Sequence, residues 1–577
     1  MSELLSHRNA ILNIATHTAT RIANMQQFTP KLITTIREGY TLAKLRTDAL
    51  AGLTVAIIAL PLAMALGIAS GASPDKGLIT AVVAGFLISA LGGSRLQIGG
   101  PTGAFVVVVF NIIAKHGYDG LIIATLMAGI ILLIAGYAKF GHMIKFIPQP
   151  VVTGFTAGIA VIIASSQVKD FFGLSIASVP AEFLAKWQMY FSSLSTFNPI
   201  SLGVGLAVLA IIIGLRHYSP RLPGFLIAII LASIVVTVLQ LPVDTVGSRF
   251  PHMTSGLAMP VWPDFSIVKI QEMLPSAFTI AFLAGIEALL SAVVADGMTG
   301  TRHRSNQELV GQGFANIASA LFGGLPATGA IARTATNIKS GAQTPVAGIL
   351  HAAFLLVFIL FATDLMAYVP MAALAAILFI VAWGMSEYKH FIRLLSMPNS
   401  DRGVLLLTFG LTVFVDLTVA IGVGVTVASL LFMARMSETV QIESGQSLLP
   451  DADQLADEIG QRDSLPKGVE VFRITGPFFF GVASELLDTL RRVGQTPKVI
   501  ILRMRLVPML DASGVSGIAE FISQARKTGA DVILSGVQAQ PKEMLGRGGI
   551  NASSLKLHFT DNYVQAIDKA KVFIEQD

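Results

Sequence analysis

The chain has 577 residues, of which 53% are hydrophobic and only 13% are charged, and its mean hydropathy is +0.70. A soluble protein carries roughly 25% charged residues, so this composition excludes a soluble globular protein and indicates many membrane spans. The absence of cysteine excludes disulfides, thiol nucleophiles and thiolate metal sites, and the net charge of +5 is too small to suggest a nucleic-acid partner.

The first 45 residues contain basic side chains but no apolar core of the signal-peptide type, so we expect a cytoplasmic N-terminal segment. Residues 46–436 form the predicted membrane domain. About fourteen apolar segments in it are long enough to span or half-span a bilayer of about 30 Å. They are 49–70, 77–93, 102–115, 120–140, 148–167, 200–215, 223–241, 274–296, 307–322, 329–340, 345–363, 369–385, 402–416 and 417–436.

Basic residues mark alternate loops of this prediction. With a cytoplasmic N-terminus, the inner loops carry more lysine and arginine in shorter segments than the outer loops do, and this asymmetry lasts to the final loop. An even number of spans with both termini in the cytoplasm follows. Residues 102–115 and 329–340 each begin with a glycine-rich phrase, GGPTGA at 99–104 and GGLPATGA at 323–330.

The two phrases share Thr-Gly-Ala at an offset of 226 residues (329 − 103). Two matching Gly/Pro-interrupted apolar segments are typical of the binding site in transporters with inverted repeats. Fourteen spans divide into seven plus seven, and because seven is odd the second copy is inverted. Free N–H groups at the start of two facing half-helices favour an anion.

Composition changes after the last span. Residues 437–466 are polar and acidic, so we expect a linker, and 467–577 alternate predicted strands and helices as a small cytoplasmic α/β domain does. The predicted strands are 469–475, 499–504, 531–535 and 555–559, and the predicted helices are 483–493, 514–527, 541–547 and 563–575.

Several motifs resemble one known family. The string SPDKGLI at 73–79, ending in GGSR at 92–95, is similar to an early signature of the SulP anion transporters (solute carrier family 26), with both signature tyrosines replaced. A second signature runs from 293 to 316, and LDASG at 510–514 resembles the strand-to-helix turn of their STAS domains. LPLAMAL at 60–66 is similar to the bacterial C4-dicarboxylate uptake members. The resemblance implies core and gate bundles, a homodimer and a bacterial inner-membrane location.

The resemblance also implies where the substrate binds. Transferred by motif, the lining residues from the first phrase are Thr102, Gly103, Ala104 and Phe105, and those from the second are Gly329, Ala330 and Ile331. An alternative is that these glycines only let helices pack closely. Arg333, about one turn into the second half-helix, is the expected source of positive potential, because an arginine at membrane depth costs about 2.5–3.5 kcal/mol or more.

Glu287 lies in the middle of a span, four residues before Ser291. Burial favours the neutral form of a carboxyl group, which makes Glu287 the candidate carrier of a coupling proton. The resemblance implies that sodium-coupled members add hydroxyls from two helices, but Ile331 stands where the second is expected, so we favour protons. The alternative is a structural Glu287–Arg333 ion pair. Leu62 and Leu66 replace the polar residues of sulfate-type members and favour a substrate with a carbon backbone.

Other polar residues admit structural roles. Asp48, Asp296, Glu308 and Asn316 lie near span ends, where we expect capping and pairing with loop arginines. Ser513 occupies the place of the phosphorylated residue in bacterial STAS regulators, and a helix N-cap explains it equally well.

These observations predict a secondary active anion transporter that takes up C4-dicarboxylates such as fumarate, succinate and aspartate with protons. The alternatives are a sulfate or bicarbonate transporter, sodium-coupled or exchanging, an uncoupled anion channel, a nucleobase permease and a regulatory scaffold. The expected partners are the small anion, protons, the lipid bilayer, a second copy of the chain and a cytoplasmic protein at the STAS domain. We expect neither an enzyme nor a cofactor.

Overall fold

The structure is a computed structural model that describes residues 27–143, 147–176, 179–219, 222–251, 256–257, 259–263, 266–444, 465–480, 482, 486, 497–551 and 557–575. Three predictions fall largely outside the described residues: the N-terminal segment up to 26, the helix 483–493 apart from Leu486, and the linker from 445 to 464. The chain divides into two compact units, 1–426 and 427–577.

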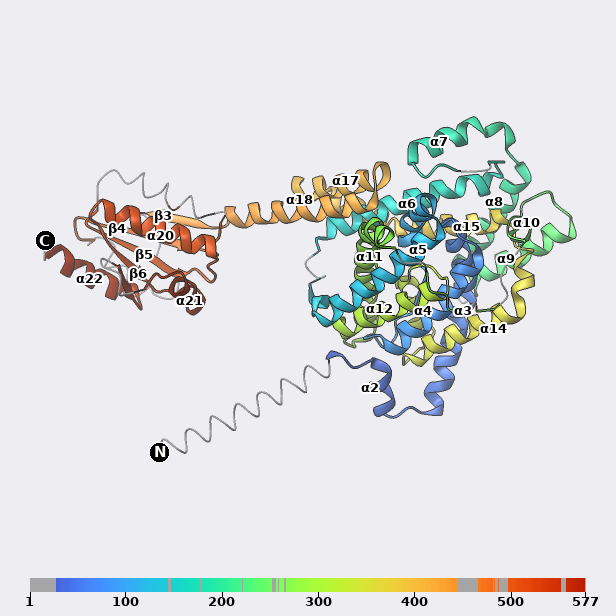
Figure 1. Cartoon of the computed structure of the whole chain (residues 1–577), viewed down its shortest axis with the longest axis horizontal. Coiled ribbons are helices and arrows are strands. Elements are labelled where there is room, and N and C mark those ends of the chain that lie inside the picture. Colours follow the sequence, from blue (N-terminus) through green and yellow to red (C-terminus); the bar gives the residue numbers. More distant parts are fainter. Residues whose placement is uncertain are drawn as a thin grey trace. The chain divides into compact units, whose positions relative to one another are not determined.

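The first unit is helical (Figure 1). Its elements are α2 (Lys31–Arg37), α3 (Leu42–Ala69), α4 (Pro74–Leu91), β1 (Gly99–Gly100), η1 (Gly103–Phe105), α5 (Val106–Tyr137), η2 (Phe140–His142), α6 (Gln149–Phe172), α7 (Phe183–Ser192), η4 (Leu194–Thr196), α8 (Pro199–Tyr218), α9 (Gly224–Val238), α10 (Val246–Arg249), α11 (Ile267–Thr299), α12 (Ser305–Leu321), β2 (Thr328–Gly329), α13 (Ile331–Lys339), α14 (Val346–Met366), α15 (Met371–Met385), α16 (Tyr388–Leu395), α17 (Asn399–Phe414) and α18 (Leu417–Glu438).

Each of the fourteen predicted apolar segments is helical. Segments 102–115 and 120–140 are the two halves of α5, which breaks at Gly117, where φ is 70° and ψ is −175°. Within the described residues, nine helices are long and apolar enough to cross a membrane, and the others of the fourteen are shorter or less apolar. The short helices α2, α7, α10 and α16 were not predicted, because none of them carries an apolar run of membrane length.

The helices pack as two bundles. One contains α3, α4, α5, α11, α12, α13 and α14, and the other contains α6, α8, α9, α15 and α17. These are the expected core and gate bundles. Side-chain caps begin several helices at polar loops: Thr41 caps α3, Asn198 caps α8 and Ser266 caps α11. Because the bilayer satisfies no backbone group, the long apolar segments between the caps are helical.

The second unit contains a five-stranded sheet in the order β3-β4-β5-β6-β7 (Figure 1). Four strands are parallel: β4 (Val469–Thr475), β5 (Val499–Leu506), β6 (Asp531–Ser535) and β7 (Leu557–Thr560). The edge strand β3 (Gln441–Ser444) is antiparallel to β4. It lies in the segment predicted as linker, so the polar residues after α18 contribute to the sheet.

Alternate strand residues enter two cores. Phe472, Ile500 and Leu502 pack with Ile518 and Phe521 of α20 (Ala512–Lys527), and Val471, Ile501 and Ile533 pack against α22 (Tyr563–Glu575) on the other face. The remaining helix is α21 (Ala539–Arg547). The sheet is therefore buried on both faces, which explains why its strands read as short continuous apolar runs.

Candidate functional site

The two glycine-rich phrases meet in the interior of the helical unit. Gly99 pairs with Gly329 and Gly100 with Thr328, so β1 and β2 form a two-residue antiparallel ladder, and the N–H of Ala330 donates to Ile98 O at 2.8 Å. A helix begins directly after each strand, η1 and α5 after β1, and α13 after β2. The antiparallel pairing places two helix N-termini, with their free N–H groups, at the same level of the bundle.

Side chains approach this ladder so closely that two of its positions have room only for glycine. Gly100 has a φ of +151°, and a Cβ there would lie 2.5 Å from Arg333 Nη1. A Cβ at Gly329 would lie 1.4 Å from the amide nitrogen of Gln97. The sequence alternative, that these glycines serve only the packing of helix on helix, therefore does not describe Gly100 and Gly329, which make room for polar side chains.

Arg333 is 3% exposed and reaches the first phrase from α13. Its Nη2 donates to the carbonyl oxygen of Pro101 at 3.0 Å, while its Nε and Nη1 have no hydrogen-bond partner among the described residues. A buried guanidinium normally uses its donors. Unpaired guanidinium nitrogens next to two helix N-termini are groups that can donate charge-assisted hydrogen bonds to an anion.

Glu287 does not pair with Arg333 within the described part of the chain, so the structural ion pair considered from the sequence is absent there. The Glu287 carboxylate accepts a hydrogen bond of 2.9 Å from the hydroxyl of Thr102 instead. Since Thr102 begins η1, this contact ties the acidic residue of α11 to the first half-helix. The carboxylate therefore lies beside the candidate anion site without neutralising its arginine.

One turn further along α11, Ser291 meets the second half-helix. Its hydroxyl lies 3.0 Å from the hydroxyl of Thr334, which also accepts from the N–H of Ile98 at 3.1 Å. From the sequence we expected a second hydroxyl at position 331, where Ile331 stands and is 40% exposed. Thr334, three positions later in the same helix, places a hydroxyl beside Ser291, and its i, i+3 spacing from Ile331 is the sequence signal for it.

The start of the first half-helix faces the other bundle. A Cβ on Gly103 would lie 2.5 Å from Met385 Sδ of α15 and 3.2 Å from a methyl group of Ile163 in α6. Ala104 and Phe105 are buried, and Ala330 is partly exposed. Leu62 is half-buried in α3, and no contact given for the described residues joins it to the glycine phrases, so its role stays a prediction.

The acidic residues near span ends are structural, but their partners differ from those predicted. Asp48 accepts from the backbone N–H groups of Gln343 and Thr344 at 2.8 and 3.2 Å, and Glu308 accepts from those of Gly93 and Ser94 at 2.8 and 3.0 Å. Asp296 pairs with His303 at 2.7 Å, and Asn316 bonds both backbone groups of Ala327. Asp48 also accepts from the hydroxyls of Tyr40 and Thr344, and Glu308 from the amide of Gln312, where we expected capping and pairing with loop arginines.

In the second unit, the N-cap of α20 is Asp511, which accepts from the N–H of Gly514 at 2.7 Å. Ser513 is exposed in the first turn and does not cap the helix, so the capping explanation of Ser513 is wrong. Its exposure leaves phosphorylation as an untested prediction.

Comparison with known proteins identifies both units. Residues 45–408 match the model of the sulfate permease family, and residues 465–566 match that of the STAS domain. A protein described as putative sulfate transporter YvdB, from Bacillus subtilis strain 168, is 40% identical over 529 residues, which cover 91% of this chain and 98% of that protein. Bicarbonate transporter BicA from Picosynechococcus is 34% identical, with coverage of 87% and 90%.

Solved structures agree with these matches. The transmembrane domain of a cyanobacterial bicarbonate transporter BicA has 32% identity and a TM-score of 0.60, covering 68% of this chain and 98% of that one. The overall structure of SLC26A9 has a TM-score of 0.82 with coverage of 97% and 95%, and at 18% identity it shows the fold alone. The chain belongs to the sulfate permease family of multi-pass anion transporters, and its C-terminal unit carries a STAS domain.

Proposed function

We propose that the chain is a secondary active transporter of a small inorganic oxyanion of the sulfate or bicarbonate class. The observation that carries the proposal is the buried guanidinium of Arg333, with two unpartnered nitrogens, beside two antiparallel half-helix starts. Backbone N–H groups and one cation can hold an oxyanion and still release it, whereas a cluster of fixed charges would retain it.

The expected C4-dicarboxylate substrate has no support in the relatives, which are described as sulfate and bicarbonate transporters. Leu62 and Leu66, which supported that expectation together with the LPLAMAL resemblance, lie in α3. The polar side chains of the site come from the start of η1, from α11 and from α13. We therefore propose the inorganic oxyanion as substrate, with the dicarboxylate as a comparison in the assay.

The lining of the site stays a proposal. We infer that Thr102, Gly103, Ala104 and Phe105 bind the anion from one side and Gly329, Ala330, Ile331 and Arg333 from the other, with Leu62 in the wall. The two bundles would then alternate access by relative motion, and the close approach of Gly103 to Met385 and Ile163 supports a site between them.

Glu287 and Ser291 are the proposed coupling residues. Proton coupling uses Glu287 alone as the carrier. The hydroxyl of Thr334 beside Ser291 favours a second candidate, sodium, because Glu287, Thr102, Ser291 and Thr334 together supply the oxygen ligands that a hard cation needs. A dimer, a cytoplasmic partner of the STAS domain and cytoplasmic termini in a bacterial inner membrane remain expectations of the same proposal.

The test is uptake of labelled sulfate, bicarbonate and fumarate into proteoliposomes, each with a proton or a sodium gradient. We expect saturable uptake of sulfate or bicarbonate, abolished in Arg333→Met and retained in the matched control Lys339→Met, an exposed residue at the end of the same helix. Glu287→Gln should uncouple uptake from the gradient. Accumulation of fumarate alone, or equal uptake by Arg333→Met, would contradict the proposal.

A further inference from the structure

The helical unit contains a cavity lined by residues outside the glycine phrases, and we call it the second cavity to distinguish it from the candidate anion site at those phrases. Its volume is about 210 Å³, and its walls come from the end of α3, the first turns of α5, the end of α6, and the short helices α7 and α10. Val106 and Val107 line it and directly follow Phe105 of the proposed substrate site. The two sites thus adjoin at the start of α5, and the cavity is lined by α7 and α10, which lie in loops that the basic residues predict to face outward.

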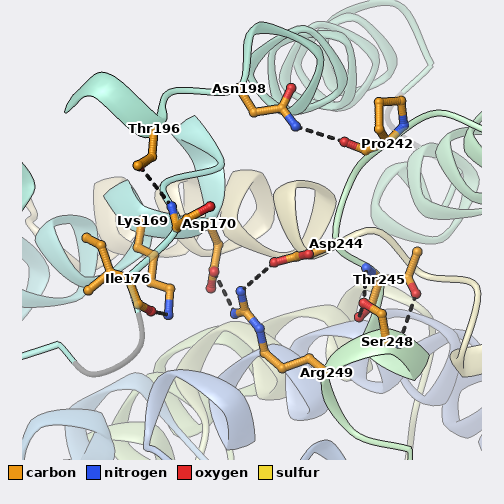
Figure 2. Close-up of polar contacts among 11 residues, drawn as sticks. Lys169, Asp170, Ile176, Thr196, Asn198, Pro242, Asp244, Thr245, Ser248 and Arg249 are labelled. Atoms are coloured by element: carbon orange, nitrogen blue, oxygen red, sulfur yellow. Dashed lines mark hydrogen bonds and ion pairs between the residues drawn. The ribbon is translucent and has the colours of Figure 1, made fainter. Parts of the chain in front are cut away.

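Four charged side chains line this cavity, three basic and one acidic: Lys169, Lys186, Arg249 and Asp170. Arg249 is held by two carboxylates, with Nη1 2.6 Å from Asp170 and Nη2 3.0 Å from Asp244 (Figure 2). Lys169 donates to the backbone carbonyl of Ile176 (Figure 2). Together with Asp244, these side chains carry three positive and two negative charges, so their net charge is +1.

Lys186 is the cation without a carboxylate. Its residue is 3% exposed, and the described part of the chain offers its ammonium no hydrogen bond or ion pair, only the face of the Phe110 ring at 5.5 Å. Burial lowers the pKa of Lys186 to about 8. Buried ammonium groups are normally paired, so an unpaired one that lines a cavity marks a place where an anion would be stabilised.

We propose that this cavity is a second binding site for a small inorganic oxyanion, held by the ammonium of Lys186 with the amide of Asn111 nearby. The inference rests on the proposed function, because it gives the transported anion a second binding site outside the central one. A cavity of about 210 Å³ holds several water-sized volumes of about 30 Å³ each, which suits a sulfate or bicarbonate ion with water. It is smaller than the roughly 300–1,000 Å³ of pockets for larger organic ligands.

The walls explain why such a site would affect transport. The end of α3 and the start of α5 belong to one bundle, and α6 belongs to the other. An anion bound here contacts both bundles on the predicted outer side. Binding in the cavity therefore raises the local concentration of the anion beside the start of α5, next to the proposed substrate site.

The first experiment measures the concentration dependence of sulfate and bicarbonate uptake by full-length protein in proteoliposomes of known orientation. Loss of a charge-assisted contact costs about 1.5–3 kcal/mol, so Lys186→Met should raise the half-saturating outer concentration about tenfold or more. Lys186→Arg should retain most of the affinity. Lys269→Met, an exposed lysine on the same predicted side and outside the cavity, should behave as wild type.

A second measurement separates this inference from the proposed function. With Trp262→Phe and Trp383→Phe, the remaining tryptophan is Trp187, next to Lys186, and its fluorescence is followed during sulfate titration. In an Arg333→Met background, which removes the cation of the central site, we expect a saturable change in fluorescence. This change should disappear when Lys186→Met is added. That result stands even if no anion is transported. No titration in this background, or equal kinetics for Lys186→Met and Lys269→Met, would overturn the second site.

Discussion

The position of the Arg333 side chain depends on which residue stands at position 100. The guanidinium occupies the space that a side chain at position 100 would need, and Gly100 adopts a backbone conformation that other residues rarely adopt. The position of the positive charge in the proposed site therefore depends on the absence of a side chain at position 100.

We expect Gly100→Ala to reduce oxyanion uptake strongly, about a hundredfold, because a displaced binding group can cost that much in rate. The matched control is Gly203→Ala in α8, where a Cβ would meet nothing within 4 Å. Both variants are compared by uptake and by size-exclusion profile. Normal uptake by a well-folded Gly100→Ala protein would separate Gly100 from the placement of Arg333.

Part of this site could be predicted from single residues. Arg333 and Glu287 stand out because charged groups are costly within a membrane, and that cost is visible in the sequence. Thr334 and Gln97 carry no such signal of cost, because hydroxyls and amides are uncharged. Thr334 could be found only by its spacing from Ile331, and the place of the loop residue Gln97 beside Gly329 follows from the folded structure alone.

At the scale of elements, the N-cap of α20 is Asp511, where from the sequence we had considered Ser513. We expect Asp511→Ala to destabilise the first turn by about 1 kcal/mol, the usual cost of losing an N-cap, while Ser513→Ala has little effect. Hydrogen exchange of the α20 amides in the full-length protein measures both. Equal protection in the two variants would show that Asp511 does not cap the helix.

The long elements were predictable because bilayer thickness imposes a minimum apolar length, which nine helices of the described residues satisfy. The elements around the second cavity were not. Helix α10 has four residues and α7 has ten, so both are too short for length and hydropathy to identify them. The edge strand β3 was missed for the same reason, since its polar sequence gains its structure from pairing with β4.

At the scale of the whole molecule, the second cavity predicts how uptake depends on pH. The folded-state pKa of Lys186, about 8, is below that of an exposed lysine, so the ammonium loses its proton as pH rises through this value. Lys169, Asp170 and Arg249 face the same cavity. The half-saturating outer concentration of sulfate, which stays a dianion, should therefore rise between pH 7 and 9.

This pH step should be absent in Lys186→Met and present in Lys269→Met. The comparison removes any pH dependence that arises from Glu287, because both variants keep that residue. A step of equal size in Lys186→Met would assign the titration to another group. The effect on stability has the opposite direction. The unfolded chain binds the proton more tightly, so folding becomes more favourable as pH rises from about 8 to the ordinary lysine pKa of 10.5.

The substrate is the part of the account that the sequence predicted least well. Backbone N–H groups and one arginine bind many oxyanions, so the chemistry of the site sets the class of ligand and leaves its size open. The replacement of two polar residues by Leu62 and Leu66 suggested a dicarboxylate, whereas relatives across most of the chain are described as sulfate and bicarbonate transporters.

Equilibrium binding of sulfate and bicarbonate to the purified full-length protein, measured by calorimetry with Arg333→Met and Lys186→Met, tests the central claim most directly. We expect one of these anions to bind the wild type at both sites. Binding at the central site should be lost in Arg333→Met and retained in Lys186→Met. Unchanged binding of both anions by the Arg333→Met and Lys186→Met double variant would contradict an anion site built on the paired glycine phrases.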